Sequence, residues 1–132
     1  MSLGAEKCYD PTKRETLAGV IDELDGTFEA SGSSAGRNLC LDLLKVWGRS
    51  SFVGFADDET TFDIHMQLIE KQIQLNGVWL FSTPDLQEFI NRASESGLSL
   101  EPLFTHRYSI SEGVEALIEF DKGSAGKTMI CW

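Results

Sequence analysis

Residues 27–55 read TFEASGSSAGRNLCLDLLKVWGRSSFVGF. The β-branched and aromatic residues of 27–30 predict a strand, and the small residues of 31–34 predict a turn with serine oxygens that can cap a helix. Helical periodicity follows over 35–46, with Gly48 expected to close the helix, and an apolar strand is expected over 50–55. A strand, a helix and a second strand form a βαβ unit, which favours a parallel sheet.

The same alternation continues on both sides of this segment, so the sequence predicts an α/β fold throughout. In the helix that begins at residue 83 and ends at Gly97, the side chains expected to face inward are Leu86, Phe89, Ile90 and Ala93. The further expected elements are a strand at 7–9, a helix over 13–24, a helix over 63–71, a strand over 72–81, an extended segment over 100–108, a helix to residue 120 and a strand over 126–132.

Composition limits the classes of function. The chain has 132 residues, of which 42% are hydrophobic, and a formal net charge of -10. This charge repels phosphate backbones and anionic membrane surfaces, so we expect no nucleic-acid or membrane partner. Cys8, Cys40 and Cys131 are too far apart in sequence for a zinc or redox motif, and we expect them to be reduced and buried. Residues 1–3 do not resemble a signal peptide, so a cytoplasmic location is expected.

Several short motifs occur in a characteristic order. Before and within the strands lie Gly4-Ala5-Glu6, Glu29-Ala30-Ser31-Gly32-Ser33, and Gly48-Arg49 leading into 52–55. More specific are KQIQLNGVW (71–79) and FTHRY (104–108), followed by Glu115-Ala116, Phe120-Asp121 and Gly126-Lys127. In this order the chain resembles the C-terminal part of a medium-chain, zinc-type alcohol dehydrogenase, and 72–79 with 105–107 is most similar to the polyol and secondary-alcohol branch.

The resemblance implies a fold, which is a partial Rossmann fold holding strands 3-4-5-6 of the parent sheet with a C-terminal helix and strand. Residues 1–103 would be a truncated dinucleotide-binding domain, and 104–132 would be the return segment of the catalytic domain. The cofactor of such enzymes lies across the carboxyl ends of the parallel strands. The residues implied to contact it are Ala30, Ser31 and Gly32 near the nicotinamide ribose, Val53, Gly54 and Phe55 along the nicotinamide, Trp79, Leu80 and Phe81 at the carboxamide, and Lys127 at the pyrophosphate.

Structural explanations compete with these assignments. Gly32 and Gly54 can simply end strands, because isolated glycines are common in turns. His106 is interpreted as structural rather than catalytic, and Lys127 can equally be a solvated surface cation. The consecutive acidic residues 57–59 are interpreted as a solvated loop, since neighbours in sequence rarely converge on one metal ion.

The sequence contains no Gly-x-Gly-x-x-Gly turn, no residue that selects between NAD and NADP, and no zinc ligand set. We therefore expect a chain that has no dehydrogenase activity alone and binds NAD or NADP weakly or not at all, zinc belonging to the parent enzyme only. A homodimer through the strand near 72–81 is expected. The alternatives are a free-standing, non-enzymatic α/β protein, or one half of a complementing dehydrogenase whose N-terminal half is a separate polypeptide. The substrate alcohol stays open.

Overall fold

The computed structural model describes residues 4–56, 59–123 and 125–132. The chain forms two compact units, Met1–Phe81 and Ser82–Trp132, and each is described by itself. Asp57 and Asp58 of the expected acidic loop lie outside the described residues, whereas Glu59 is exposed. The expected domain boundary between 103 and 104 concerns the parent enzyme and stays a prediction.

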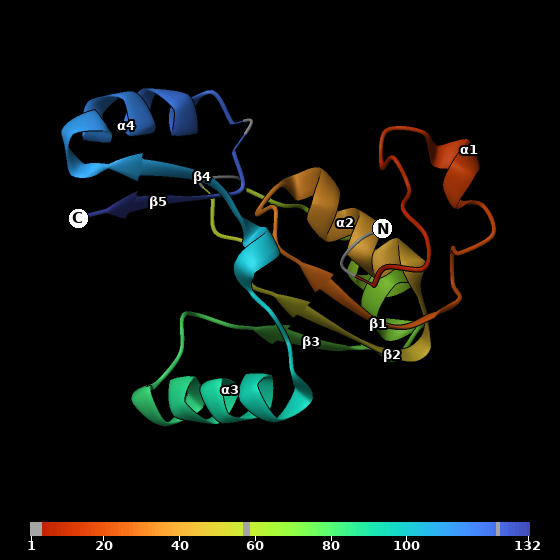
Figure 1. The fold of residues 1–132 in the computed structure, drawn as a ribbon. Helices are drawn as coiled ribbons and strands as arrows, with labels where there is room; N and C mark the ends of the chain where they lie inside the picture. The colour runs from red at the N-terminus through yellow and green to blue at the C-terminus, as the bar shows by residue number, and fades with distance from the viewer. Residues whose placement is uncertain (1–3, 57–58, 124) are drawn as a thin grey trace. The chain divides into compact units, whose positions relative to one another are not determined.

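The first unit contains a parallel sheet of β1 (Leu24–Glu29), β2 (Leu44–Phe52) and β3 (Gln74–Gly77), in that order (Figure 1). Helix α2 (Ser34–Leu43) connects β1 to β2 and packs on one face of the sheet. Leu41 and Leu44 are fully buried there. The α/β fold with a parallel sheet, predicted from the alternation of residues 27–55, is confirmed.

Helix α2 begins as predicted and ends earlier. The Ser33 hydroxyl accepts a hydrogen bond from the backbone N–H of Gly36 at 3.0 Å, which caps the first turn. The chain enters β2 directly at Leu44, so the expected extension of the helix to Val46 is wrong, and Gly48 lies in a strand instead of closing a helix. Pairing of β2 with β1 offers this segment backbone hydrogen bonds that outweigh its helical periodicity.

The elements before β1 differ from expectation. Residues 7–9 form no strand, because no neighbouring strand supplies hydrogen bonds to them. The expected helix over 13–24 is reduced to α1 (Arg14–Leu17), followed by turns until β1 begins at Leu24. Leu17 is buried and anchors this short helix. The residues of 13–24 therefore form a short helix, turns and the start of β1, and not one continuous helix.

The segment between β2 and β3 contains the π-helix η1 (Ile64–Ile69), whose first turn is capped by the Asp63 carboxylate. The helix predicted over 63–71 is thus present in a shorter and wider form. Strand β3 spans four residues, so the long strand expected over 72–81 is wrong. Gln72 has a φ of +50°, which is not an extended conformation, so the strand begins only at Gln74. Beyond the end of β3, Val78 N–H donates one more hydrogen bond to β2.

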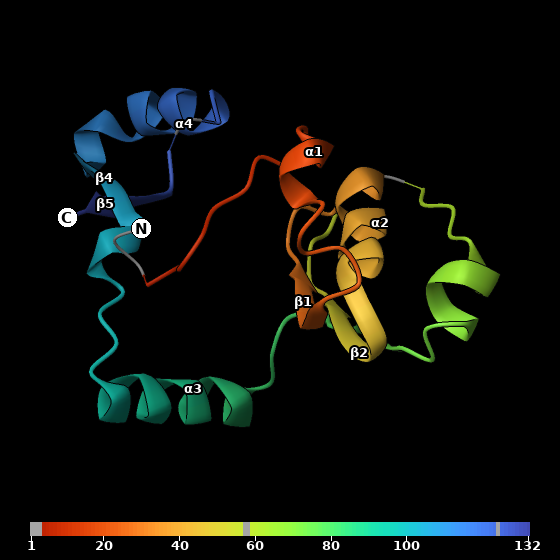
Figure 2. The same ribbon diagram turned by 90° about the vertical axis from the view of Figure 1, so that its right-hand side faces the viewer.

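The second unit contains α3 (Thr83–Ser96), η2 (Glu101–Leu103), β4 (Phe104–Ser109), η3 (Ile110–Glu112), α4 (Gly113–Asp121) and β5 (Lys127–Cys131). Strands β4 and β5 pair in parallel, and α4 connects them (Figure 2). The predicted last helix and terminal strand are confirmed. Leu86, Phe89 and Ile90 stay 40%, 47% and 50% exposed, so the inward face expected of α3 is wrong, since α3 buries none of its residues.

Cysteine burial was also mispredicted. Cys8 and Cys131 are exposed, and only Cys40 is partly buried, although all three are free thiols as expected. Burial of Cys40 raises the pKa of its thiol. Within the described part of the chain, no helix has the length and apolar character to cross a membrane.

The N-terminus of α3 yields a stability prediction. The Ser82 hydroxyl accepts from Asp85 N–H, and the Asp85 carboxylate accepts from Ser82 N–H at 2.9 Å, a reciprocal capping box. We expect Ser82→Ala to lower the free energy of unfolding by about 1 kcal/mol, measured by urea denaturation. Ser94→Ala, at an exposed serine in the same helix, is the control, and equal stability of the two variants would contradict the prediction.

A candidate cofactor edge at the carboxyl ends of the sheet

The loops that follow β1, β2 and β3 leave the sheet at one edge. Glu29 pairs with Phe52, and Phe52 pairs with Gly77, so the three strands end side by side. Backbone bonds extend this register: Val53 N–H donates to Glu29 O at 2.9 Å, and Val78 N–H donates to Phe52 O at 3.0 Å. We call the loops 30–32, 53–55 and 78–81 the carboxyl edge. It contains every predicted cofactor residue except Lys127.

Gly32 and Gly54 bring the first two loops into backbone contact. A Cβ built on Gly54 would lie 2.2 Å from Gly32 N and 2.7 Å from Ala30 C, far inside van der Waals distance. A Cβ on Gly32 would meet Ala56 N at 2.9 Å, and Gly32 has a φ of +72°, a conformation that favours glycine. The contact between the loops therefore explains both glycines without a ligand, and it fixes the relative position of the two loops.

The loops 53–55 and 78–81 also contribute an aromatic pair. The rings of Phe55 and Trp79 lie 4.9 Å apart between centroids at an edge-to-face angle of 67°. Phe55 is 74% exposed and Trp79 68% exposed, and Leu80 and Phe81 beside them are 70% and 65% exposed. The carboxyl edge thus presents an open apolar surface, of the kind that marks binding sites on soluble proteins.

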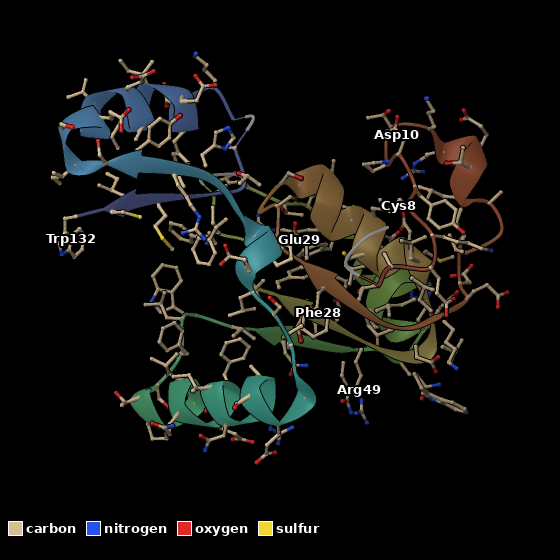
Figure 3. The ribbon with its side chains drawn as sticks, viewed as in Figure 1. Cys8, Asp10, Phe28, Glu29, Arg49 and Trp132 are labelled. Carbon is tan, nitrogen blue, oxygen red and sulfur yellow. The ribbon has the colours of Figure 1, made fainter. Side chains whose placement is uncertain are left out.

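Glu29 is the residue of this edge that sequence reasoning missed. It is the last residue of β1 and only 2% exposed, and its side chain lies on the α2 side of the sheet (Figure 3). Its carboxylate accepts hydrogen bonds from Ser31 N–H at 2.7 Å, from Gly32 N–H at 2.9 Å and from the Ser31 hydroxyl. A signal was available: an acidic residue closing a buried strand, followed by residues 31 and 32 whose N–H groups need acceptors.

The ionised form of Glu29 is favoured. Burial by itself would raise the pKa of this carboxyl, but the hydrogen bonds from Ser31 and Gly32, together with the nearby Arg37 guanidinium, outweigh burial and hold the pKa below its usual value. Because the folded-state pKa is depressed, the carboxylate stabilises the fold above the unfolded-state pKa. This stabilisation is lost as pH falls through the lower, folded-state pKa.

The acid dependence of stability tests this assignment. We expect the wild type to unfold more easily in urea as pH falls below about 4.5, while Glu29→Gln, which cannot titrate at this position, loses stability less steeply. The difference in the free energy of unfolding between the wild type and Glu29→Gln should therefore become smaller as pH falls. A constant difference across the acid range would show that the Glu29 charge does not contribute.

Two further residues singled out from the sequence, Lys127 and His106, belong to the second unit. Lys127 begins β5 in the second unit, where its side chain is exposed. His106 lies in β4 of that unit, where its Nδ1 is 2.8 Å from Thr105 Oγ1 and its ring stacks on Tyr108 with centroids 6.5 Å apart. These neighbours within the strand account for the orientation of the imidazole ring.

A hollow of about 440 Å³ lies beside the first turn of α2. Its lining residues are Pro11, Thr12, Arg14, Ser31, Ser33, Ala35, Gly36, Asn38 and Leu39. It shares Ser31 with the carboxyl edge but includes neither Gly54 nor Trp79. The apolar surface formed by Phe55 and Trp79 is thus distinct from this hollow.

Comparison with known proteins assigns the family. The family model described as zinc-binding dehydrogenase matches residues 1–95. The chain belongs to this family. The predicted resemblance to zinc-type alcohol dehydrogenases is therefore confirmed. The matched residues include the carboxyl edge.

Curated relatives of this zinc-binding dehydrogenase chain are much longer than the chain itself. L-threonine 3-dehydrogenase of Caldanaerobacter subterraneus subsp. tengcongensis is 26% identical over 97% of this chain and 39% of its own length. D-xylulose reductase of Saccharomyces cerevisiae is 32% identical over 72% of this chain and 26% of its own length. The chain thus spans about a quarter to two fifths of the length of these relatives.

Solved structures agree with the fold. Benzyl alcohol dehydrogenase from Acinetobacter calcoaceticus superimposes with a TM-score of 0.80 at 22% identity, covering 98% of this chain and 38% of that one. A short chain alcohol dehydrogenase from Escherichia coli CFT073, complexed with cofactor NADH, gives a TM-score of 0.81 at 16% identity, covering 98% of this chain and 39% of that one. At these identities, the likeness establishes the fold alone.

The metal that gives the family its description has no ligand set in the described part of this chain. Among residues 4–56, 59–123 and 125–132, no group of three His, Cys, Asp or Glu side chains is placed to hold an ion. Tetrahedral zinc requires such a convergence of ligands. These residues therefore do not fit zinc.

Proposed function

We propose that the carboxyl edge is the nicotinamide side of an NAD or NADP site in a zinc-type alcohol dehydrogenase. The observation that carries this proposal is the convergence of loops 30–32, 53–55 and 78–81 at the ends of parallel strands, with Phe55 and Trp79 forming an exposed apolar wall. Ligands of open α/β sheets bind in this place.

The roles of the chain's residues in this proposal follow from their positions. Gly32 and Gly54 fix the two loops against each other, and Val53 and Phe55 border the surface on which a nicotinamide ring would lie. The backbone of 79–81 would hold the carboxamide. A contact of Lys127 with the pyrophosphate stays an expectation from the family resemblance. The bound cofactor would supply hydride transfer to or from an alcohol carbon in the complete enzyme.

Activity of the isolated chain is a separate proposal. Because the described residues hold no zinc ligand set and the sequence lacks a glycine-rich pyrophosphate turn, we propose that the chain alone does not oxidise alcohols. A coupled assay of NADH formation from secondary alcohols and polyols tests this. Alcohol-dependent NADH formation by the purified chain would overturn it.

Cofactor binding is tested by calorimetry with NADH and NADPH, and in parallel by tryptophan fluorescence. Trp79 lies at the carboxyl edge, and Trp132 is 99% exposed at the end of the second unit. Because the sequence lacks a glycine-rich pyrophosphate turn, we expect weak but saturable quenching that disappears in Trp79→Phe and persists in Trp47→Phe and Trp132→Phe. Quenching that depends on Trp132 instead, or no heat of binding up to millimolar cofactor, would contradict the proposed site.

A homodimer through β3 is also proposed. Strand β3 is an edge strand of the sheet, and its four residues are exposed. Unpaired backbone groups on such an edge can pair with a second copy. Sedimentation should give a dimer that Leu75→Pro converts to a monomer, with Leu75→Val, which keeps the backbone N–H of the strand, as the control. A monomeric wild type would contradict this proposal.

One observation favours the complementing-half alternative. Phe28, next to Glu29 in β1, is 79% exposed, on the face of the sheet opposite α2 (Figure 3). The curated relatives are much longer than the segment that matches this chain. A separate chain carrying the rest of the dehydrogenase fold would cover this face, and restored alcohol oxidation on mixing would support it.

A further inference from the structure

We infer that Glu29 is a positioning residue of the carboxyl edge, which holds the loops after β1 and β2 in the arrangement that a nicotinamide ring would meet. The inference rests on the proposed function of this edge. It assigns Glu29 no contact with cofactor or substrate. Its role is to act through the backbone of the residues that would make such contacts.

Glu29 accepts hydrogen bonds from the backbone of both loops. Its side-chain carboxylate receives the N–H groups of Ser31 and Gly32, with Gly32 N 2.9 Å from Oε1 and 3.1 Å from Oε2. Its backbone carbonyl receives the N–H groups of Val53 and Gly54, both at 2.9 Å. One residue therefore fixes the backbone of both loops, from its side chain in one case and from its main chain in the other.

The contact between the loops depends on this arrangement. Gly54 lies so close to Gly32 that a Cβ on Gly54 would be 2.2 Å from Gly32 N and 2.7 Å from Glu29 Oε2. The carboxylate thus lies directly beneath the glycine pair. If Gly32 moved away from Glu29, the surface bordered by Val53, Gly54 and Phe55 would lose its contact with the loop 30–32.

A carboxylate is the group that these donors require. Two backbone N–H groups and the Ser31 hydroxyl all donate to it. All three donors reach Oε1, and Gly32 N–H also reaches Oε2 at 3.1 Å, so a glutamine amide in this place would put an NH₂ donor against the Gly32 N–H. The Arg37 guanidinium of α2 is a charged group near Glu29, and burial together with the Glu29 charge raises the pKa of the Cys40 thiol in the same helix.

The buried charge is costly unless its hydrogen bonds are satisfied, and a small apolar residue could end β1 at lower cost. Such a charge is well suited to fixing backbone amides at a site, because charge-assisted hydrogen bonds are short and directional. The burial of Glu29 against the loop that carries Ser31 and Gly32 therefore points to positioning of that loop.

The test compares Glu29→Gln with Glu23→Gln, an exposed carboxylate in the same unit that undergoes the same change of charge. Amide hydrogen exchange of Ser31 and Gly32 is followed by NMR, and NADH affinity is measured by calorimetry. We expect Glu29→Gln to speed exchange at both amides and to weaken NADH binding, each by about tenfold or more, while Glu23→Gln changes neither.

The outcomes separate this inference from the proposed function. If Glu29→Gln leaves exchange at Ser31 and Gly32 unchanged, or leaves NADH affinity unchanged while wild type binds, the positioning role is wrong. If the wild type does not bind NADH, the proposed function fails, and the exchange rates alone decide whether Glu29 orders the loop.

A second measurement covers a Glu29→Gln variant that does not fold. In the wild type, the amide shifts of Ser31 and Gly32 are followed during acid titration, in which neither the Arg37 guanidinium nor the Cys40 thiol changes protonation. We expect both amides to titrate together with the Glu29 side chain. Amide shifts that stay constant while Glu29 is protonated would overturn the inference.

Discussion

Gly54→Ala is expected to disrupt the carboxyl edge more than alanine at any other glycine of the chain. The new Cβ would lie 2.2 Å from Gly32 N and 2.7 Å from Ala30 C, and both are backbone atoms that cannot rotate away. We expect the free energy of unfolding to fall by about 3 kcal/mol or more and NADH binding to be lost. Urea denaturation and calorimetry measure the two effects.

Gly77→Ala is the matched control for this substitution. Gly77 ends β3 on the same sheet, and a Cβ built on it meets no atom within 4 Å. We expect its stability to change by less than about 1 kcal/mol. Comparable losses in the two variants would show that the contact between loops 30–32 and 53–55 does not determine the stability of the edge.

Lys71→Met is expected to destabilise the first unit at the end of α2. The Lys71 ammonium donates to the carbonyls of Leu41, Asp42 and Leu44 at 2.9 to 3.0 Å and lies 2.6 Å from Asp22 Oδ1, with its side chain only 16% exposed. Methionine keeps the aliphatic length but leaves these carbonyls without the donor. We expect a loss of about 2 to 4 kcal/mol in thermal or urea unfolding.

Lys45→Met provides the comparison. Lys45 pairs with Asp25 at 2.5 Å, but both side chains are well exposed, at 48% and 88%. Exposed ion pairs contribute little, so we expect a change of less than about 1 kcal/mol. If Lys71→Met were no more destabilising than Lys45→Met, the ammonium would not be the cap of α2.

The parts of the fold that could be predicted from sequence are those set by local chemistry. Ser33 and the small residues before it place the start of α2, and Ser82, Pro84 and Gly97 place both ends of α3. The end of α2 could not be predicted in this way. It depends on Lys71, which reaches the last carbonyls from a distant part of the chain, and on strand pairing that only the folded chain reveals.

Hydrophobic periodicity predicted burial and strand pairing least well where, among the described residues, no second layer of secondary structure covers the element within its own unit. The apolar residues of α3 show a helical pattern, and the helix forms, but Phe89 and Ile90 stay half exposed. The segment 7–9 has strand-like composition but no neighbouring strand to pair with. A pattern predicts which face of an element is apolar, and it cannot supply the surface that covers this face.

The candidate site was predictable because parallel strands end at one edge. The family resemblance implied the residues of the three loops, and the structure brings these loops to one edge through the pairs Glu29 with Phe52 and Phe52 with Gly77. Their contact with a cofactor stays a prediction. Glu29 escaped notice because acidic residues at strand ends are usually solvated. Its importance depends on the positions of the Ser31 and Gly32 N–H groups, which only the folded loop defines.

The most direct test of the nicotinamide assignment is an NMR titration of the isotope-labelled chain with nicotinamide mononucleotide and, separately, with adenosine monophosphate. These ligands represent the two halves of the cofactor. The account predicts that the nicotinamide half shifts the amides of Gly32, Gly54 and Trp79, while the adenosine half leaves them in place. Equal shifts with both halves, or no shift at these three amides with the nicotinamide half, would contradict it.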